Sequence, residues 1–532
     1  GLIAINSVPY YRNPVKLDAQ REAGHRLSER QQFVVDSVLK DYDDGIRQTY
    51  LLRGITGSGK TEVYMELIAQ MIQRGRQAVM LIPEIALTYQ TVLRFYKRFG
   101  DRVSVMNSTL SPGEKYDQCE RARKGEIDVI IGPRSALFTP FPDIGIIIID
   151  EEHENSYKSE TMPKYHARET AEELAALHGA SVFLGSATPS LESFYRAKQG
   201  KYRLFTLNER LTGGVLPTVY VEDLRQELKN GNRSIFSKRL QSLLEDRLGR
   251  GEQSMLFLNR RGYAGFVSCR MCGHVMKCPH CDVSLSEHRN GTLVCHYCGF
   301  TQPAVKLCPE CGSKYILGFR AGTEQIEEQL HKLYPDKKVL RMDADTTKTK
   351  DSYEKILSAF SAGEADILVG TQMIVKGHDF PNVTLMGILA ADMSLSVNDY
   401  RAGERTFQLL TQAAGRAGRG TRPGEVVIQT YQPEHYSILH AAAQDYEGFY
   451  EEEILYRQLL SYPPVSHILA VQVTSAAQEG GEVLAGQLKR LCEGAPEGRE
   501  EKTIIIGPAP AFIGRINDIF RYVLYVKNPD YE

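Results

Sequence analysis

The sequence predicts an α/β fold built on buried parallel strands, and two stretches carry the prediction. In the first, an apolar strand end at Tyr50 to Leu52 enters a glycine-rich turn and then an amphipathic helix from Glu62 to Gln73. In the second, the apolar strand Ile146 to Ile149 ends on acidic residues. Doubly wound sheets place their chemistry at such carboxyl ends. At 532 residues the chain is too long for one core, so we expect three or four domains.

The composition excludes several classes of protein. Charged residues make up 24% and hydrophobic residues 42% of the chain, as in ordinary globular proteins. Its apolar runs are far shorter than the roughly 20 residues of a membrane span, so we expect no membrane contact. Because the formal net charge is −2, any nucleic acid must be held by local basic patches rather than by bulk attraction.

The glycine-rich turn fits the phosphate-binding pattern GxxxxGKT, with its glycines at Gly54, Gly57 and Gly59. A turn of this kind directs backbone N–H groups and the positive end of a helix dipole at an anion. Lys60 is expected to reach the β- and γ-phosphates of ATP, and Thr61 is expected to hold Mg²⁺.

The acidic run after the second strand, Asp150-Glu151-Glu152-His153, supplies the other half of an ATPase site. We expect Asp150 to bind Mg²⁺ and Glu151 to orient and deprotonate the attacking water, because phosphoryl transfer requires mainly positioning and charge stabilisation. An acidic strand end alone is usually just solvated. Combined with the phosphate-binding turn upstream, it indicates ATP hydrolysis.

Eight of the ten cysteines form four CxxC pairs between Cys269 and Cys311, and no secretion signal is visible. This clustering indicates metal thiolates rather than disulfides. Two pairs complete one tetrahedral zinc site, so we expect two structural Zn²⁺ ions in a module that folds around them as its own unit. Four pairs can combine in three ways, and the short intervening segments favour nesting. The nested sets are Cys269, Cys272, Cys308 and Cys311 for one ion, and Cys278, Cys281, Cys295 and Cys298 for the other.

Four further stretches follow a fixed order along the chain. They are "LSERQQ" around Gln31, "GSATPS" from Gly185, "ILVGTQMIVKGHDF" from Ile367, and "QLLTQAAGRAGRG" from Gln408. This array resembles the superfamily-two helicases, whose motor consists of two RecA-like lobes with ATP bound between them.

The resemblance implies a role for one or more residues of each stretch. The implied roles are adenine contact for Gln31; coupling of hydrolysis to movement for Ser186 and Thr188; lining of the ATP cleft and nucleic-acid contact for Gly370, Thr371, Gly377 and Asp379; and charge stabilisation at the γ-phosphate for Arg416 and Arg419. Two arginines three residues apart on a presumed helix share one face and can both reach a phosphate.

The cysteine-rich insertion narrows the resemblance to the primosomal protein N′ family of bacterial replication-restart DNA helicases. Stretches such as "LFLNRRGYA", "AGTEQIEEQL", "RQLLSYPPV" and "IIGPAPA" also resemble this family, and the resemblance covers essentially the whole chain. One departure is Asn107-Ser108-Thr109, where the family usually has His-Ser-Gly, and we assign no role there.

Membership of this family would imply a monomeric, DNA-stimulated ATPase of the bacterial cytoplasm, associated with the nucleoid. It would bind stalled or branched forks and single-stranded DNA, unwind duplex DNA, and start primosome assembly so that the replicative helicase is reloaded. Its implied partners are other primosome proteins, the single-stranded DNA-binding protein and the helicase loader.

We expect DNA contacts in the first lobe. The stretch "IGPRSALFTPF" offers Arg134 directly after a predicted strand. In the family, an aromatic-rich loop after the acidic run links DNA binding to hydrolysis, and its aromatic and basic content suits base stacking and phosphate contact. A plain solvated loop is the alternative. The residues expected in this role here are Tyr157, Lys158, Tyr165, His166 and Arg168.

These features give a domain map. Residues 1–26 are polar and too few to form a core, so we expect them to be a linker from an N-terminal DNA-binding module of the family. The first lobe is expected at 27–205, the second at 206–440 with the cysteine-rich module at 266–316, and a small α/β domain at 441–532. The basic and aromatic residues of that last domain suit single-stranded DNA or a partner, although a packed sheet with a charged outer face explains them nearly as well.

Two other classes of protein share part of this pattern. An RNA helicase would contain both lobes but has no need of eight inserted cysteines. A non-catalytic zinc scaffold would need the cysteines, but not Lys60, Glu151 and Arg419 together.

Overall fold

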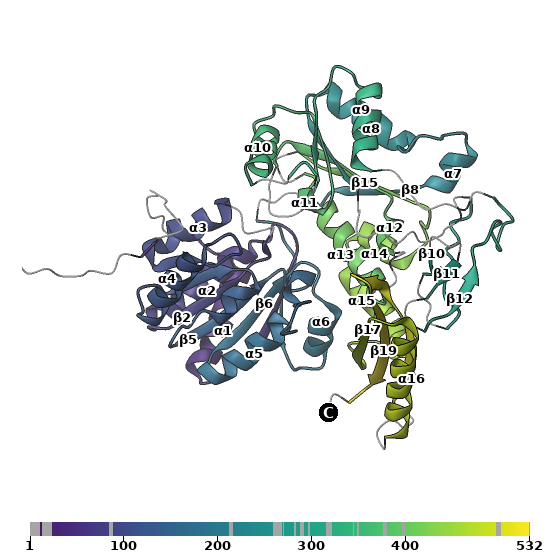
Figure 1. The fold of residues 1–532 in the computed structure, drawn as a ribbon. Helices are drawn as coiled ribbons and strands as arrows, with labels where there is room; N and C mark the ends of the chain where they lie inside the picture. Colours follow the sequence, from purple (N-terminus) through teal and green to yellow (C-terminus); the bar gives the residue numbers. More distant parts are fainter. Residues whose placement is uncertain are drawn as a thin grey trace, which may run out of the picture. The chain divides into compact units, whose positions relative to one another are not determined.

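The structure is a computed structural model of the chain. It describes residues 11–12, 24–84, 89–211, 216–258, 269, 271–280, 284–287, 292–295, 298–314, 316, 322–343, 345–347, 350–375, 380–395, 397, 399–418, 420, 422–495 and 502–530. The chain divides near residue 214 into two compact units, the first drawn from purple to blue and the second from teal to yellow in Figure 1.

A seven-stranded parallel sheet forms the centre of the first unit, with the strand order β3-β4-β2-β5-β6-β1-β7. Its strands are β1 Thr49–Gly54, β2 Gln77–Leu81, β3 Val103–Val105, β4 Val129–Gly132, β5 Ile144–Asp150, β6 Ser181–Ser186 and β7 Arg203–Leu207. Because the strands are parallel, the carboxyl ends of β5, β6 and β1 lie side by side at one edge.

Helices cover this sheet, as buried parallel strands require. They are α1 Glu29–Asp43, α2 Lys60–Gln73, α3 Tyr89–Phe99, α4 Pro112–Arg123, α5 Ala167–His178 and α6 Leu191–Lys198. One apolar cluster joins α1, α2 and α3 to the strands, whereas α5 packs on β5 and β6. Ser28 begins α1 with a capping box, in which its hydroxyl accepts from Gln31 N and the Gln31 side chain accepts from Ser28 N.

The second unit contains a six-stranded parallel sheet with the order β13-β14-β9-β15-β16-β8. The strands are β8 Thr218–Asp223, β9 Gln253–Leu258, β13 Val339–Met342, β14 Ile367–Gly370, β15 Val383–Leu389 and β16 Glu425–Thr430. Its helices are α7 Leu224–Lys229, α8 Lys238–Gly249, α9 Thr323–Leu333, α10 Lys350–Ser361, α11 Gln372–Val375, α12 Asp392–Leu395, α13 Ala402–Ala414, α14 Tyr436–Ala443 and α15 Tyr446–Leu459. The core of this sheet is formed with α8 and α9.

Two small antiparallel sheets complete the second unit. The cysteine-rich module contains β10 Ser286–Glu287, β11 Thr292–Val294 and β12 Thr301–Pro303. The C-terminal sheet has the order β17-β19-β18, from β17 His467–Ser475, β18 Ile504–Ile516 and β19 Ile519–Asn528, with α16 Gln478–Gly494 packed on it. No helix in the described ranges has both the length and the apolar character to cross a membrane.

The two parallel sheets, the cysteine-rich insertion in the second lobe and the small C-terminal domain agree with the predicted fold class. The expected domain boundaries differ in places from the ends of the observed helices and strands. The first lobe extends past the expected residue 205, because β7 pairs with β1 as far as Leu207. The expected boundary at 440 falls inside α14.

We predict that Gly185→Ala destabilises the first lobe by about 1–3 kcal/mol through overpacking. Gly185 lies in β6, and a Cβ atom there would stand 1.7 Å from Tyr64 Oη on α2. Urea unfolding of the variant measures the effect. Gly249→Ala is the control, because a Cβ at that position meets nothing within 4 Å. Equal stability of the two variants would contradict the close packing of α2 on β6.

Candidate ATPase edge and metal centre

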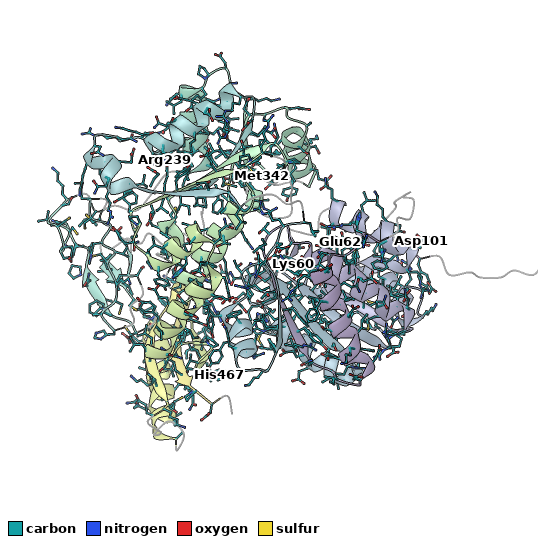
Figure 2. All side chains as sticks on the ribbon, turned by 180° about the vertical axis from the view of Figure 1, so that it is seen from behind. Lys60, Glu62, Asp101, Arg239, Met342 and His467 are labelled. Carbon is teal, nitrogen blue, oxygen red and sulfur yellow. The ribbon has the colours of Figure 1, made fainter. Side chains whose placement is uncertain are left out.

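The phosphate-binding turn lies between the end of β1 and the start of α2. Gly57 and Gly59 have positive φ values of 85° and 75°, which favour glycine. Lys60, which is labelled in Figure 2, begins α2, and its Nζ donates to the Gly54 carbonyl at 2.9 Å. No described side chain caps the N-terminus of α2, and the buried Ser58 Oγ has no hydrogen-bond partner among the described residues. The turn therefore offers unused donors to an anion.

Gln31 from α1 lies against this turn. Its side-chain amide donates to the carbonyls of Ser58 and Gly59 at 3.0 and 3.2 Å. A Cβ atom at Gly59 would stand 2.3 Å from Leu211 Cδ1 and 2.5 Å from the Gln31 amide nitrogen, so a larger residue there would displace these side chains. The structure thus brings Gln31 and the phosphate-binding residues together, although the adenine contact expected of Gln31 stays a prediction.

Asp150 stands at the carboxyl end of β5, beside the turn. The Tyr64 hydroxyl donates to its Oδ1 at 3.0 Å, and the Tyr157 hydroxyl donates to its backbone carbonyl at 2.7 Å. Burial and then the neighbouring charge of Glu151 raise the pKa of Asp150 to about 7, whereas Lys60 and the Tyr64 hydrogen bond oppose the rise. A cation beside the carboxylate favours its ionised form, so this donor set fits Mg²⁺.

Glu151 follows in an uncommon backbone conformation, with φ at 46°. Such a position costs a non-glycine residue about 1–3 kcal/mol and is most common at functional sites. Its Oε2 is buried without a hydrogen-bond partner among the described residues, and His153 Nδ1 lies 3.7 Å away. His153 Nδ1 is also 2.7 Å from Ser186 Oγ, which accepts from Thr188 N. The acidic run therefore contacts the GSATPS stretch.

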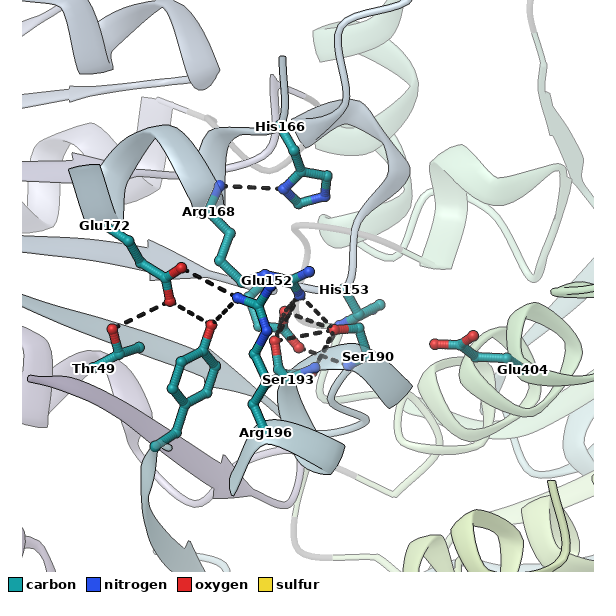
Figure 3. A network of polar contacts seen from close by, with 12 residues as sticks. Thr49, Glu152, His153, His166, Arg168, Glu172, Ser190, Ser193, Arg196 and Glu404 are labelled. Carbon is teal, nitrogen blue, oxygen red and sulfur yellow. Dashed lines mark hydrogen bonds and ion pairs between the residues drawn. The ribbon is translucent and has the colours of Figure 1, made fainter. Parts of the chain in front are cut away.

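Glu152 forms a second and fully buried connection to that stretch (Figure 3). Its carboxylate accepts from Ser190 N at 2.6 Å and from the Ser193 hydroxyl at 2.7 Å. Arg168 Nη1 lies 3.3 Å from the same carboxylate and donates to Ser190 Oγ at 2.9 Å. A buried carboxylate paired and hydrogen-bonded in this way is fixed in position. The acidic turn, the start of α5 and the start of α6 are thereby joined.

Two residues expected in the aromatic-rich loop are buried, so they cannot stack on bases or contact phosphates. Arg168 is 5% exposed and Tyr157 is 1% exposed. The expectation that these two side chains face DNA is therefore corrected. Arg168 is on the buried side of α5 with Ala171 and Ala175. The buried Tyr157 hydroxyl donates to the Asp150 carbonyl.

The rest of the loop and Arg134 form one surface. Arg134 Nη1 donates to the Lys158 carbonyl at 2.5 Å, and its guanidinium lies 5.8 Å from the ring centroid of Tyr165. Phe138, which is 59% exposed, packs edge-on against Tyr165 at 5.2 Å. Lys158 and His166 form an antiparallel bridge that closes the loop. We call Arg134, Phe138, Lys158, Tyr165 and His166 the loop surface, which combines positive charge with the exposed ring of Phe138 and the partly exposed ring of Tyr165.

In the second lobe, Thr371 follows β14 directly, and Arg416 follows α13. Arg416 Nε donates to the carbonyl of Val375, the last residue of α11, at 2.6 Å. This bond joins the two helicase-like stretches of the lobe. Gly377, Asp379 and Arg419 lie outside the described residues, so their expected roles stay predictions.

Two groups of thiols gather in the cysteine-rich module. Cys269, Cys272, Cys308 and Cys311 form one, and Cys278, Cys295 and Cys298 form the other, with Sγ atoms within 4.8 Å of one another in each group. These are the groups that nesting predicts, and Cys281 lies outside the described residues. Sulfur pairs at 3.5 and 3.6 Å are close to the ~3.8 Å that tetrahedral ligation with Zn–S bonds of about 2.3 Å requires.

The chemistry of these sulfurs also fits zinc. Burial raises the pKa of the Cys272 and Cys278 thiols to about 12. Several thiolates this close together are stable only around a cation, and an all-sulfur tetrahedral site is typical of zinc.

The described part of the module shares its apolar cluster with the C-terminal part of the chain, and the expectation that the module folds independently stays a prediction. Leu285, Leu293 and Cys295 share one apolar cluster with Tyr462 of the second unit, and Tyr525 of β19 packs against that cluster. At the other end, Arg225 donates to the Cys272 carbonyl at 3.2 Å. The cluster is therefore common to the module and the C-terminal sheet.

Sequence reasoning missed Glu152 and Tyr64, although both hold the site together. Glu152 belongs to the acidic run, and only the order of β5 and β6 reveals its bonds to Ser190 and Ser193. Tyr64 is four residues after Lys60 on the amphipathic helix, and its apolar neighbours concealed the hydroxyl's role.

Family models match four parts of the chain. They are "DEAD/DEAH box helicase" at residues 20–196, "PriA DNA helicase Cys-rich region (CRR) domain" at 278–303, "Helicase conserved C-terminal domain" at 307–421, and "Primosomal protein N C-terminal domain" at 458–532.

Curated relatives carry the name replication restart protein PriA. The Bacillus subtilis protein is 49% identical over 94% of this chain and 62% of its own length. The Treponema pallidum protein is 36% identical over 96% of this chain and 76% of its own length. The chain spans about three fifths of the first relatives' lengths, at 62% and 59%. Among solved structures, "Structure of RecG bound to three-way DNA junction" aligns with a TM-score of 0.47 at 18% identity, covering 81% of this chain and 47% of that one.

We predict that Arg168→Met lowers the free energy of unfolding of the first lobe by about 3–5 kcal/mol, because Glu152 is left buried without its cation. Lys158→Met is the control at an exposed position and should change stability by less than about 0.5 kcal/mol. Urea unfolding measures both. If Arg168→Met instead leaves stability unchanged and weakens binding to single-stranded DNA, Arg168 is a surface contact.

A second prediction concerns zinc and the shared core. Chelation should expose β17 and β19 to limited proteolysis together with the module, since Tyr525 loses the cluster it packs on. The first lobe, residues 24–207, should stay resistant. Elemental analysis should find two zinc ions per chain before chelation. Cleavage confined to the module, with the C-terminal sheet protected, would show that the module is independent after all.

Proposed function

Because the chain belongs to the PriA family of replication restart proteins, we propose that it is a DNA-stimulated ATPase that moves along DNA and unwinds it at stalled or branched forks. The observation that carries the proposal is the edge where β5, β6 and β1 end. Lys60 begins the helix after β1, Asp150 ends β5 and accepts from Tyr64 of the same helix, and Glu151 follows Asp150 directly. Lys158, Tyr165 and His166 of the loop surface follow the same acidic run, so this part of the proposed DNA contact is joined in sequence to the group that acts on ATP.

The proposed mechanism assigns each residue a step. The turn from Gly54 to Gly59 and the N-terminus of α2 bind the phosphates, and Lys60 releases the Gly54 carbonyl to contact them. Mg²⁺, held by Thr61 and Asp150, supplies charge screening of the phosphates when bound. Glu151 accepts the proton of the attacking water and keeps it in line, because its Oε2 has no competing hydrogen bond among the described residues.

Coupling is proposed to run through the two connections of the acidic run. DNA on the loop surface shifts the loop that begins at His153, and His153 contacts Ser186. The GSATPS turn then transmits the change through Thr188. Thr371 is proposed to contact the nucleic-acid backbone from the second lobe, and Arg416 and Arg419 are proposed to act on the γ-phosphate.

Two structural zinc ions complete the proposed cofactor set. The wider role includes primosome assembly and reloading of the replicative helicase, with the single-stranded DNA-binding protein and the helicase loader as partners in the bacterial cytoplasm. What supports this wider role is family membership.

We predict that Glu151→Gln retains nucleotide binding but lowers kcat by at least about a hundredfold, because only the base for the water is lost. Lys60→Ala should instead weaken nucleotide binding itself. Fluorescent-nucleotide binding and single-stranded-DNA-stimulated phosphate release measure the two effects separately. The DNA stimulation should fall steeply between 50 and 200 mM salt, as phosphate contacts require. If Glu151→Gln hydrolyses ATP at close to the parent rate, Glu151 is not the base that accepts the water's proton.

A further inference from the structure

Arg457, near the end of α15, is the largest fully buried side chain described, with 1% exposure. Its guanidinium donates from three nitrogens to three different segments. Nε contacts Glu453 Oε1 at 2.7 Å on the same helix, and Nη2 contacts Glu404 Oε2 at 3.1 Å on α13. Nη1 donates to the Pro463 carbonyl at 2.7 Å, just before β17. One side chain therefore joins α13, α15 and the entrance to the C-terminal sheet.

Neighbouring residues are fitted to this junction. The Tyr436 hydroxyl of α14 donates to Glu453 Oε2. Gly403 on α13 leaves the space, because a Cβ atom there would stand 2.8 Å from both Glu453 Oε2 and the Tyr436 oxygen. The Arg457 guanidinium also lies 4.9 Å from the Tyr400 ring centroid. All of these contacts lie within the second unit.

The cost of this arrangement indicates that it does more than stabilise. Glu404, Glu453 and Arg457 are 4%, 2% and 1% exposed, so three charges have been removed from water. Buried ion pairs seldom stabilise a fold more than an apolar replacement would, and their best-attested use is to fix one arrangement of the elements that carry them. The junction thus sets the position of α13 relative to the C-terminal sheet.

Contacts on both sides extend the junction. On one side, α13 continues into the stretch that contains Arg416, whose Nε is bonded to the end of α11. On the other side, the buried Lys527 of β19 donates to the Leu460 carbonyl at 2.9 Å. Lys527 Nζ also lies 3.7 Å from the Tyr462 ring centroid, and Tyr462 stacks on Tyr400 at 4.8 Å.

We propose that Arg457 is a positioning residue that couples the C-terminal sheet to α13, and through α13 to the stretch of the second lobe that contains Arg416. A force or ligand acting on the C-terminal sheet would shift Pro463 and Leu460, and the rigid guanidinium fork would pass the shift to Glu404. The functional consequence rests on the proposed ATPase activity.

The main test is the double variant Glu404→Gln/Arg457→Met. It keeps the formal charge of the three side chains at −1 and removes the bond between α13 and α15. Basal kcat should stay within about twofold, whereas stimulation of kcat by single-stranded DNA should fall about tenfold, a typical coupling effect. Arg457→Lys should keep the fold but not restore stimulation, because an ammonium cannot reproduce the planar fork.

A matched control exists in the same unit. Arg247 is buried and pairs with Glu425 and Glu252. Glu425 is the first residue of β16, and Glu252 directly precedes β9. Arg247→Met/Glu425→Gln should lower the melting temperature comparably and leave the DNA stimulation ratio unchanged. Equal loss of stimulation in both double variants would overturn the proposal, because general destabilisation would then explain the effect. Full stimulation of Glu404→Gln/Arg457→Met by single-stranded DNA would also overturn the proposal.

Hydrogen exchange tests the junction without relying on activity. In Glu404→Gln/Arg457→Met, amides of α13 and of β17 should lose protection together, and in the Arg247 control they should not. Faster exchange in only one of the two elements would overturn the proposal. If the parent protein shows no DNA stimulation while the paired loss of protection is observed, the proposed function fails and the structural coupling stands.

Discussion

The bond between Glu152 and the start of α6 fixes the geometry on which the candidate ATPase edge depends. Parallel strands bring β5 and β6 to the same edge, but the turns that follow them are polar, and polar turns are held only by specific bonds. Glu152 supplies these bonds inside the protein, and Arg168 balances its charge. Glu152 is buried, and Asp150 and Glu151 directly precede it at the end of β5. Glu151 bears the strain of the turn after β5 in its positive φ.

A shared apolar core plays the corresponding part in the second unit. The cysteine-rich module, the segment around Tyr462 and the C-terminal sheet each contribute side chains to one apolar cluster. Their common cluster joins them, and Arg457 and Lys527 add directional bonds at its margin. Apolar contacts permit several arrangements of similar energy, whereas buried charges permit few. The unit therefore uses metal and apolar contacts for stability and buried ionic bonds for orientation.

Much of the fold and of the candidate site could be predicted from sequence. The parts that could not be predicted depend on contacts between residues that lie far apart in the chain. Lys60, Thr61 and Asp150 belong to short strand–turn motifs, so local periodicity was enough to place them. The four CxxC pairs indicated the grouping of thiols because their spacing is short. The family resemblance predicts Arg168 as a surface contact, although Ala167, Ala171 and Ala175 at helical spacing mark a buried face beside it. The partners of Glu152 and Arg457 could not be predicted, since they depend on strand order and helix packing over long separations.

The proposed function requires that the loop surface and the acidic turn act as one DNA-responsive ATPase. Phosphate release measured with single-stranded DNA, with RNA of the same sequence, and with no nucleic acid tests this most directly. We predict strong stimulation by DNA, little by RNA, and loss of the DNA effect when Arg134 and Tyr165 on the loop surface are replaced by alanine. Equal stimulation by RNA, or hydrolysis indifferent to any nucleic acid, would contradict the account.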